Sequence, residues 1–259
     1  MGGKNALALN TEKTKMIVIG TPQRIRTIGN LNIMFNNVLI QQCDTLKCLG
    51  LTIDNTLRWD IHIEKMAKLC HFRICSLYKI RQFIPDKFKL VLGHALVLSL
   101  VSYMSSIWSS ATSNCLATFE KVIRSLARFI SGKQRHDSVA PTICNELKWL
   151  FPKEFGCYNL LCIMFKLRNM LPVEFFDGYF VLNNLSHSYP TSTSVSGSLS
   201  YNYVPTTKYG YTTFHFRAID LWNKLPNDLK QCSSLNVFKN KLKKHFLVSQ
   251  CNRLGIHSE

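Results

Sequence analysis

The stretch LKCLGLTIDNTLRWDIHI, residues 46–63, contains the change from strand to helix around which the chain is organised. Its first half is rich in apolar and β-branched side chains, which favours a buried strand. Asp54-Asn55 is a turn signal, because both side chains hydrogen-bond readily to nearby backbone. From Asp60 onward the pattern is typical of the first turn of a helix, where acidic side chains are favoured.

Short strand signals also precede this stretch. Residues 15–20, KMIVIG, predict a strand that Gly20-Thr21-Pro22 ends, and residues 31–43 carry Asn36-Asn37 between two apolar runs, which indicates a hairpin. TLKCLGLTID, residues 45–54, is the third predicted strand. Together they predict a small antiparallel sheet, which needs something to pack on because so few strands bury little surface.

Helical spacing replaces the strand pattern after residue 58. The first predicted helix has a buried face with lysines off that face, and the next begins at Pro85-Asp86. A third is capped by Thr112 or Ser113 and ends at Gly132. The two core faces consist of Ile63, Met66, Cys70, Ile74 and Leu77, and of Leu116, Phe119, Ile123, Leu126 and Ile130.

Residues 90–108, LVLGHALVLSLVSYMSSIW, contain no acid, Lys or Arg and reach the length of a membrane span. Several serines, a Gly and a His make the segment less apolar than a typical span. A buried core helix is therefore the favoured interpretation, with a membrane-associated helix as the alternative.

The second half of the chain predicts more helices around one polar stretch. Residues 137–182 predict two helices, the second closed by Pro172, and residues 183–213 are rich in Ser, Thr, Tyr and Asn, which is typical of a loop or linker. Residues 214–248 then predict two short helices. Ser233 or Ser234 caps the second of these, which has an apolar stripe beside several lysines.

The net charge of +17 is unusual and unevenly distributed. Residues 61–135 carry 12 Lys and Arg against 3 Asp and Glu, whereas residues 136–182 carry 4 against 5. A strongly basic surface favours a polyanionic partner, with nucleic acid as the first choice and an anionic membrane surface as the second.

The ten cysteines show no CxxC spacing. Reduced cysteines in the core, as in proteins of the cytosol or nucleus, are favoured over a metal site. The four tryptophans lie in apolar runs or at helix starts, so core packing is favoured over base stacking. Asp54, Asp60 and Glu64 are the clustered acids nearest the opening stretch, and a turn and a helix start explain them better than a metal pair does.

Several segments together resemble one family. Residues 7–20, LALNTEKTKMIVIG, are similar to the segment after the catalytic aspartate pair in reverse transcriptases of non-LTR (LINE-type, jockey-like) retrotransposons. Residues 46–63 resemble the primer-grip region that runs into the thumb of these enzymes. Further short matches to the thumb and tail follow in the same order: YMSSIWSSA, VIRSLARFISG, ELKWL, MLP and LWNKLPNDLKQCSSLNVFKNKLKKHFL.

The resemblance implies the C-terminal portion of an RNA-directed DNA polymerase that works by target-primed reverse transcription. In that family an Asp of an early palm strand and a Tyr/Phe-Ala-Asp-Asp hairpin hold two metal ions. This chain contains neither that tetrapeptide nor any Asp-Asp pair. The parent enzyme is expected to use Mg²⁺, whereas this chain is expected to hold no cofactor and to be inactive alone. Whether it is a complete product, a truncated transposon copy or a mis-assigned reading frame stays open.

The candidate nucleic-acid contacts fall into three groups. Lys13 matches the basic position of the family pattern and is either a solvated turn residue or a backbone contact. Leu49 and Gly50 lie in the primer-grip-like segment, where a small residue lets a primer approach, and a buried strand with a Gly bulge is the alternative. The third group comprises basic helical faces that would contact phosphates, with ordinary solvated faces as the alternative: Lys65, Lys68, Arg73, Lys79, Lys121, Arg124 and Arg128.

The sequence therefore predicts an α+β chain with RNA and DNA as partners, without a small-molecule substrate or a membrane span, inside the nucleus or cytoplasm. The expected order is a partial palm with a small antiparallel sheet (1–58), a basic helical thumb (59–135), a helical C-terminal region (136–182), a linker (183–213) and a closing helical segment (214–248). A non-enzymatic RNA- or DNA-binding helical module is the main alternative. Hydrolase and nucleotidase functions have no supporting motif.

Overall fold

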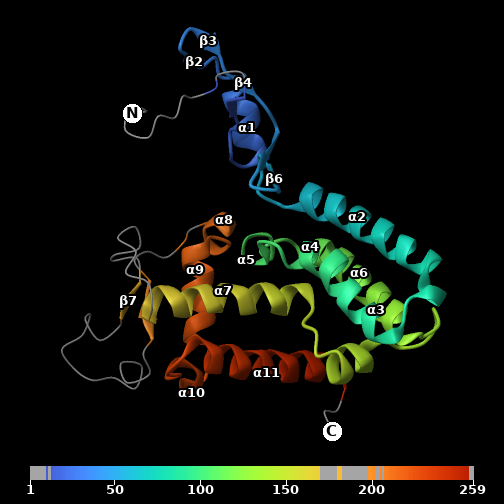
Figure 1. Cartoon of the computed structure of the whole chain (residues 1–259). Coiled ribbons are helices and arrows are strands. Elements are labelled where there is room, and N and C mark those ends of the chain that lie inside the picture. The colour runs from blue at the N-terminus through green and yellow to red at the C-terminus, as the bar shows by residue number, and fades with distance from the viewer. Residues whose placement is uncertain are drawn as a thin grey trace, which may run out of the picture.

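The computed structural model describes Asn10, residues 13–169, 180–182, 198–201, Pro205 and residues 207–256. Most of the predicted linker 183–213 lies outside the described residues, as does Pro172. The chain combines a small N-terminal segment containing short strands with a larger body of helices (Figure 1). The predicted α+β class is confirmed at this level.

The N-terminal segment projects from the start of α2 (Figure 1). Its elements are β1 (Lys15–Met16), α1 (Pro22–Ile28), β2 (Met34–Phe35), β3 (Val38–Leu39), β4 (Gln41–Gln42), β5 (Thr45–Cys48) and β6 (Leu51–Asp54). Among the apolar side chains of residues 13–55, Ile40 and Leu51 are buried, while at least eight others are exposed. The segment therefore has almost no core of its own.

The strand pairing confirms one hairpin and corrects the rest of the predicted sheet. β2 and β3 pair antiparallel around Asn36 and Asn37, whose φ angles of 50° and 59° are those of a two-residue hairpin turn. β1, however, pairs in parallel with β4, because the chain passes through α1 and the hairpin before it returns. The prediction of a wholly antiparallel sheet is wrong, and these strands form separate two-stranded pairs.

The single strand predicted for residues 45–54 is also wrong. β5 and β6 form a second antiparallel hairpin that turns at Leu49 and Gly50, with φ angles of 46° and 85°. Leucine seldom adopts a left-handed conformation, so Leu49 is not a recognisable turn signal in the sequence. The alternative interpretation, a buried strand with a bulge at Gly50, is also wrong. Leu49 and Gly50 lie in the hairpin turn, and Leu49 is 76% exposed.

The first hydrophobic cluster forms where α2 (Asp60–Lys79) packs on α6 (Ser113–Ser131). The two helices run in the same direction, since Asp60 meets Cys115 at their starts and the rings of Tyr78 and Phe129 meet near their ends. Both predicted core faces are buried or partly buried. Thr112 precedes α6 and Gly132, at φ 76°, ends it, as the sequence predicts.

Residues 86–108 connect these two helices and do not form one continuous helix. They divide into α3 (Asp86–Gly93), a π-helix (His94–Leu98), α4 (Ser99–Ser102) and α5 (Ser105–Trp108). The helical run is continuous from Asp86 to Ser102 and breaks at Tyr103, so the predicted core helix is wrong only in reaching residue 108. Val97, Val101 and Trp108 are buried, as that prediction requires. Over the described part of the chain, no helix combines the length and apolar character needed to cross a bilayer.

The second hydrophobic cluster lies where α7 (Pro152–Asn169) and α11 (Leu235–Arg253) run side by side in opposite directions (Figure 1). The stacked rings of Phe165 and Phe238, with centroids 4.4 Å apart, join them at one end. At the other end Arg253 pairs with Glu154 at 3.0 Å. The remaining elements of the described residues are a 3-10 helix (Arg81–Phe83), a π-helix (Thr142–Glu146), β7 (Val181–Leu182), β8 (Leu199–Ser200), α8 (Lys208–Tyr211), α9 (Phe214–Asn223) and α10 (Asn227–Lys230).

The closing segment differs from its prediction in length. Ser234 caps α11 as expected, but α11 is 19 residues long and α10 stands between it and α9. All four tryptophans are buried, between 0% and 7% exposed, which confirms their assignment to the core. All ten cysteines are free thiols.

Candidate nucleic-acid interface

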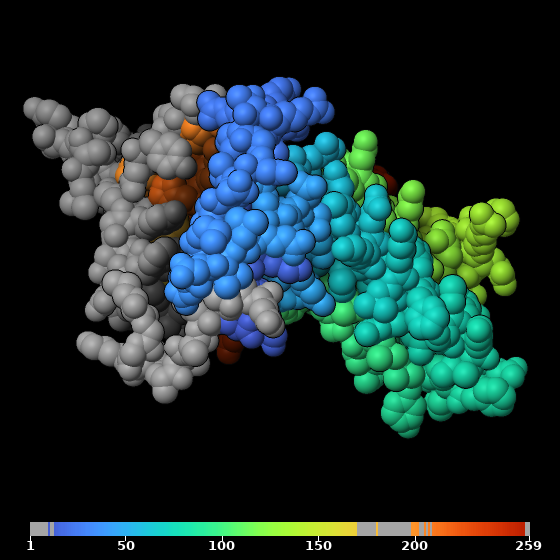
Figure 2. Space-filling view, turned by 90° about the horizontal axis from the view of Figure 1, so that it is seen from above, coloured from blue at the N-terminus to red at the C-terminus, as the bar shows by residue number. Residues whose placement is uncertain are grey.

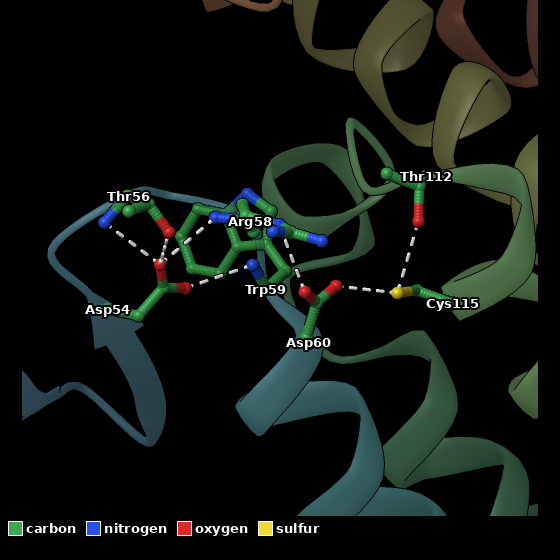
Figure 3. Close-up of polar contacts among 7 residues, drawn as sticks. All are labelled: Asp54, Thr56, Arg58, Trp59, Asp60, Thr112 and Cys115. Carbon is green, nitrogen blue, oxygen red and sulfur yellow. Dashed lines mark hydrogen bonds and ion pairs between the residues drawn. The ribbon is translucent and has the colours of Figure 1, made fainter. Parts of the chain in front are cut away.

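The carboxylate of Asp54 organises the turn between β6 and α2 (Figure 3). One of its oxygens accepts hydrogen bonds from the Thr56 and Arg58 amides and from the Thr56 hydroxyl, and the other accepts from the Trp59 amide at 3.0 Å. Burial alone would raise the pKa of Asp54, but these hydrogen bonds outweigh it and the pKa is lowered. The predicted role as a turn residue is confirmed.

Asp60 begins α2 and joins it to the start of α6. One carboxylate oxygen pairs with Arg58 Nε at 3.1 Å, and the other accepts a hydrogen bond from the Cys115 thiol at 2.6 Å (Figure 3). Burial, and then the contact with Asp60, raise the pKa of Cys115, so the thiol stays protonated and able to donate. Asp54 and Asp60 thus both stabilise the fold at the head of α2.

The tip of the second hairpin is held from a distant part of the chain. The hydroxyl of Tyr103, in the bend between α4 and α5, donates to the carbonyl of Leu49 at 2.7 Å. An added Cβ on Gly50 would lie 3.2 Å from Tyr103 Cε1, so the tyrosine ring covers this turn closely. The amide of Thr52 donates to Nδ1 of His62, which seats the same hairpin on the first turn of α2. The predicted primer-grip-like residues therefore sit on a braced, exposed turn beside α2.

The outward face of α2 carries exposed cations and one exposed ring. Lys65, Lys68 and Lys79 are exposed, as their positions off the core face predict, and Phe72 lies among them on the helix with 70% of its surface exposed. Figure 2 shows the outer surface of α2 next to the N-terminal segment on one face of the molecule. Lysines spaced along a helix can contact successive phosphates as point charges, and an exposed ring can stack on a base or sugar.

The three predicted arginines make contacts within the protein. Arg73 Nη1 donates to the carbonyl of Leu96 at 2.7 Å, within the π-helix. Arg124 pairs with Glu120 at 3.9 Å and lies 4.9 Å above the ring of Phe151. Arg128 Nη2 reaches the carbonyl of Asp137 at 3.5 Å. These side chains therefore have structural partners that the sequence did not reveal.

Two further predicted contacts are exposed lysines outside α2. Lys13 follows Asn10 in a turn, where its amide donates to the Asn10 side chain at 3.1 Å and Thr14 donates to the Asn10 carbonyl. Lys121 lies on the exposed side of α6. The turn predicted around Lys13 is confirmed, and its contact with nucleic acid stays a prediction.

The described residues do not gather the ligands for the Mg²⁺ that the family resemblance led us to expect in an intact enzyme. Among the residues that the structure describes, no three His, Cys, Asp or Glu side chains gather as metal ligands. Asp54 and Asp60 already accept hydrogen bonds from the turn, from Arg58 and from Cys115. The two aspartates therefore serve the fold and do not fit the role of a metal-binding pair.

Two residues of this candidate interface were not predicted from the sequence. Tyr103 acts on a turn 54 positions earlier in the chain, and such a distant contact leaves no local pattern. Phe72 was not singled out because a lone aromatic on a basic face also occurs on ordinary solvated helices. The position of Phe72 opposite the apolar stripe was the available signal.

Comparison with known proteins identifies no relative, since neither a family model, nor a curated protein, nor a solved structure matches the chain.

Proposed function

We propose that the chain is the end of the palm, the thumb and the C-terminal tail of a non-LTR retrotransposon reverse transcriptase, and that it binds the backbone of an RNA–DNA primer–template. The observation that carries the proposal is the outward face of α2, where Lys65, Lys68 and Lys79 are exposed around Phe72. The braced turn at Leu49 and Gly50 lies beside the start of the same helix. Backbone contacts of this kind position a duplex without reading its sequence.

The exposed apolar side chains of the N-terminal segment support the same proposal. Met34, Leu39 and Leu49 are 61%, 55% and 76% exposed. Apolar strands with so little core need a packing partner, and the rest of a polymerase palm would provide one. A non-enzymatic nucleic-acid-binding module is the second candidate, supported by the use of Asp54 and Asp60 in the turn and helix start.

Salt-dependent binding tests the proposal. We expect an RNA–DNA hybrid to bind the chain tightly at low salt, with the logarithm of the association constant falling linearly with the logarithm of salt concentration. Binding that is absent at low salt, or that persists unchanged at high salt, would contradict the proposal. A hybrid with a recessed primer end binding better than a blunt duplex of equal length would favour the polymerase interpretation over a general module. Primer extension with Mg²⁺ or Mn²⁺ should yield no product.

A further inference from the structure

An apolar cavity of ≈ 370 Å³ lies apart from the outward face of α2. Its walls come from the π-helix His94–Leu98, from α4, from the loop around Trp149, from the start of α7 and from α11. Segments far apart in the sequence thus converge on one hollow. Its volume falls within the range of pockets that bind small organic ligands.

Two residues or segments with unusual backbone conformations line the cavity, and a further one lies nearby in the sequence. The π-helix His94–Leu98 contributes His94 and Leu98 to its wall, and a second π-helix, Thr142–Glu146, ends just before Lys148. Lys148 itself adopts a left-handed conformation with φ 52°. π-Helical turns are rare and often occur at functional sites, and residues with strained backbone cluster at ligand sites more than elsewhere.

Aromatic side chains form part of the cavity wall, beside aliphatic ones. The ring of Trp149 packs edge-on against His94, with centroids 5.4 Å apart, and its indole N–H donates to His94 Nε2 at 3.2 Å. Because that donor is already satisfied, Trp149 offers the cavity apolar ring atoms. Phe155 and Tyr158 lie stacked at 6.3 Å on the first turns of α7 and complete the aromatic lining.

The charge around the cavity is positive. Lys148 and Lys243 reach it from two different segments, both exposed, and no acid is found among the described residues that line it. Burial and the charge of Lys243 lower the pKa of His94, which favours a neutral imidazole that accepts the Trp149 N–H. A ligand suited to this site has a flat apolar ring and a nearby negative charge.

We propose that this cavity binds one nucleotide, with the base against the aromatic side chains and the phosphate at Lys148 and Lys243. The inference rests on the proposed function, since an unpaired nucleotide of the bound strand is one source of this ligand and a free nucleotide is the other. Base stacking on aromatic side chains is sequence-tolerant, so the pocket is expected to accept any base.

Direct titration with AMP tests the pocket. We expect AMP to bind the whole chain in calorimetry and to change its tryptophan fluorescence through Trp149. Lys243→Glu should weaken AMP binding at least tenfold, whereas Lys244→Glu, an exposed neighbour on the same helix that does not line the cavity, should leave it within twofold. Absence of AMP binding to the unmodified chain, or equal loss in both variants, would overturn the inference.

A second variant fills the cavity without changing charge. Ser99 is exposed on α4 and lines the hollow, so Ser99→Phe should place a ring inside it and abolish AMP binding. A circular-dichroism spectrum and melting temperature equal to those of the unmodified chain would show that the fold is retained. AMP binding unchanged in this folded variant would place the nucleotide elsewhere and overturn the inference.

Two oligonucleotides separate the sources of the nucleotide. If the source is an unpaired strand, a hybrid with a single-stranded overhang should bind more tightly than the blunt hybrid, and Ser99→Phe should remove that difference. If the source is a free nucleotide, the two hybrids should bind alike while AMP still binds. If the chain binds the blunt hybrid but neither prefers the overhang nor binds AMP, the nucleotide pocket is rejected and the proposed function is retained. Loss of all hybrid binding would reject the proposed function first.

Discussion

The lysines of α2 and the arginines near them carry the same charge but occupy opposite environments. Lys65, Lys68 and Lys79 extend from the outward face of the helix. Arg73, on the same helix, is half-buried and hydrogen-bonded to the π-helix, and Arg124 lies between Glu120 and an aromatic ring. A guanidinium has five donors in a planar fork and satisfies carbonyls and rings better than an ammonium does.

This contrast changes how the charge of the region is interpreted. Residues 61–135 carry 12 Lys and Arg, but some of these cations stabilise the fold and are less available to a ligand. The comparison predicts that lysine and arginine substitutions affect different properties, binding and stability respectively. Substitution of the α2 lysines should reduce binding at constant stability, and substitution of the arginines should reduce stability first.

The largest expected effect is on binding by the variant Lys65→Ala/Lys68→Ala/Lys79→Ala. If the three lysines contact phosphates as proposed, the variant should weaken binding of an RNA–DNA hybrid about a hundredfold or more near 0.1 M salt and reduce the salt slope by roughly 2.7. The free energy of unfolding should change by less than about 0.5 kcal/mol per site, as for exposed surface positions. Fluorescence anisotropy over a salt series and urea unfolding measure the two quantities.

The matched control removes the same charge elsewhere. Lys153→Ala/Lys241→Ala/Lys244→Ala changes three exposed lysines of α7 and α11. We expect a much smaller loss of hybrid affinity from this variant. An equal loss from both triple variants would mean that overall charge, not the α2 face, drives binding.

Arg73→Met tests the other side of the comparison. The variant keeps much of the aliphatic stem but removes the hydrogen bond from Nη1 to the Leu96 carbonyl, so the free energy of unfolding should fall by about 2–3 kcal/mol. Lys68→Met, on the exposed face of the same helix, should change it by less than about 0.5 kcal/mol. Urea unfolding measures the free energy of unfolding of both variants. Equal stability of the two would contradict the proposed difference between the lysines and the arginines.

Asp54→Asn extends the comparison to the acids at the head of α2. The amide cannot accept from both Thr56 and the Trp59 amide as the carboxylate does, so stability at neutral pH should fall by about 2 kcal/mol. Because folding lowers the pKa of Asp54, its contribution is fully present above the pKa of the unfolded chain, about 3.9. The contribution is lost as the pH falls through the lower pKa of the folded state.

Melting temperatures of the unmodified chain and of Asp54→Asn between pH 7 and pH 2.5 check this sign. The difference between the two proteins should stay constant above about pH 5 and shrink below about pH 4. A difference that grows on acidification would contradict the lowered pKa. Added Mg²⁺ should not alter the difference, because Asp54 holds the turn.

The helices of the first cluster could be predicted because their signals are local. The apolar spacing in α2 and α6, the Gly132 stop and the Asn36-Asn37 turn each depend on neighbours within a few residues. The same spacing placed Lys65, Lys68 and Lys79 on the exposed side. Where one face of a helix is buried, the sequence therefore predicts which side chains are exposed on the opposite face.

The remaining features depend on distant contacts. The apolar run contains a π-helix at residues 94–98. There the Leu96 carbonyl accepts a hydrogen bond from Arg73, which lies on α2. The turn at Leu49 is braced by the Tyr103 hydroxyl, and the cavity is lined by side chains from segments as far apart as His94 and Lys243. Local propensity contains no information about such partners, so neither the π-helix nor the pocket could be predicted.

The smallest expected effect concerns the hairpin tip, and it asks whether that tip belongs to the same binding surface as the α2 lysines. Tyr103→Phe keeps the ring against Gly50 but removes the hydrogen bond to the Leu49 carbonyl, so the free energy of unfolding should fall by about 1 kcal/mol. If the tip touches the duplex, its looser turn should also weaken hybrid binding about two- to fivefold without changing the salt slope, since no charge is lost.

Tyr209→Phe removes the hydroxyl of an exposed tyrosine in another part of the chain and serves as the matched control for that measurement. If Tyr103→Phe alone changes hybrid affinity, the hairpin tip and the outward face of α2 belong to one interface. Unchanged affinity in both variants, with the expected loss of stability in Tyr103→Phe, would restrict the interface to α2. The tip would then belong with Arg73 and Asp54, among the polar contacts that maintain the fold.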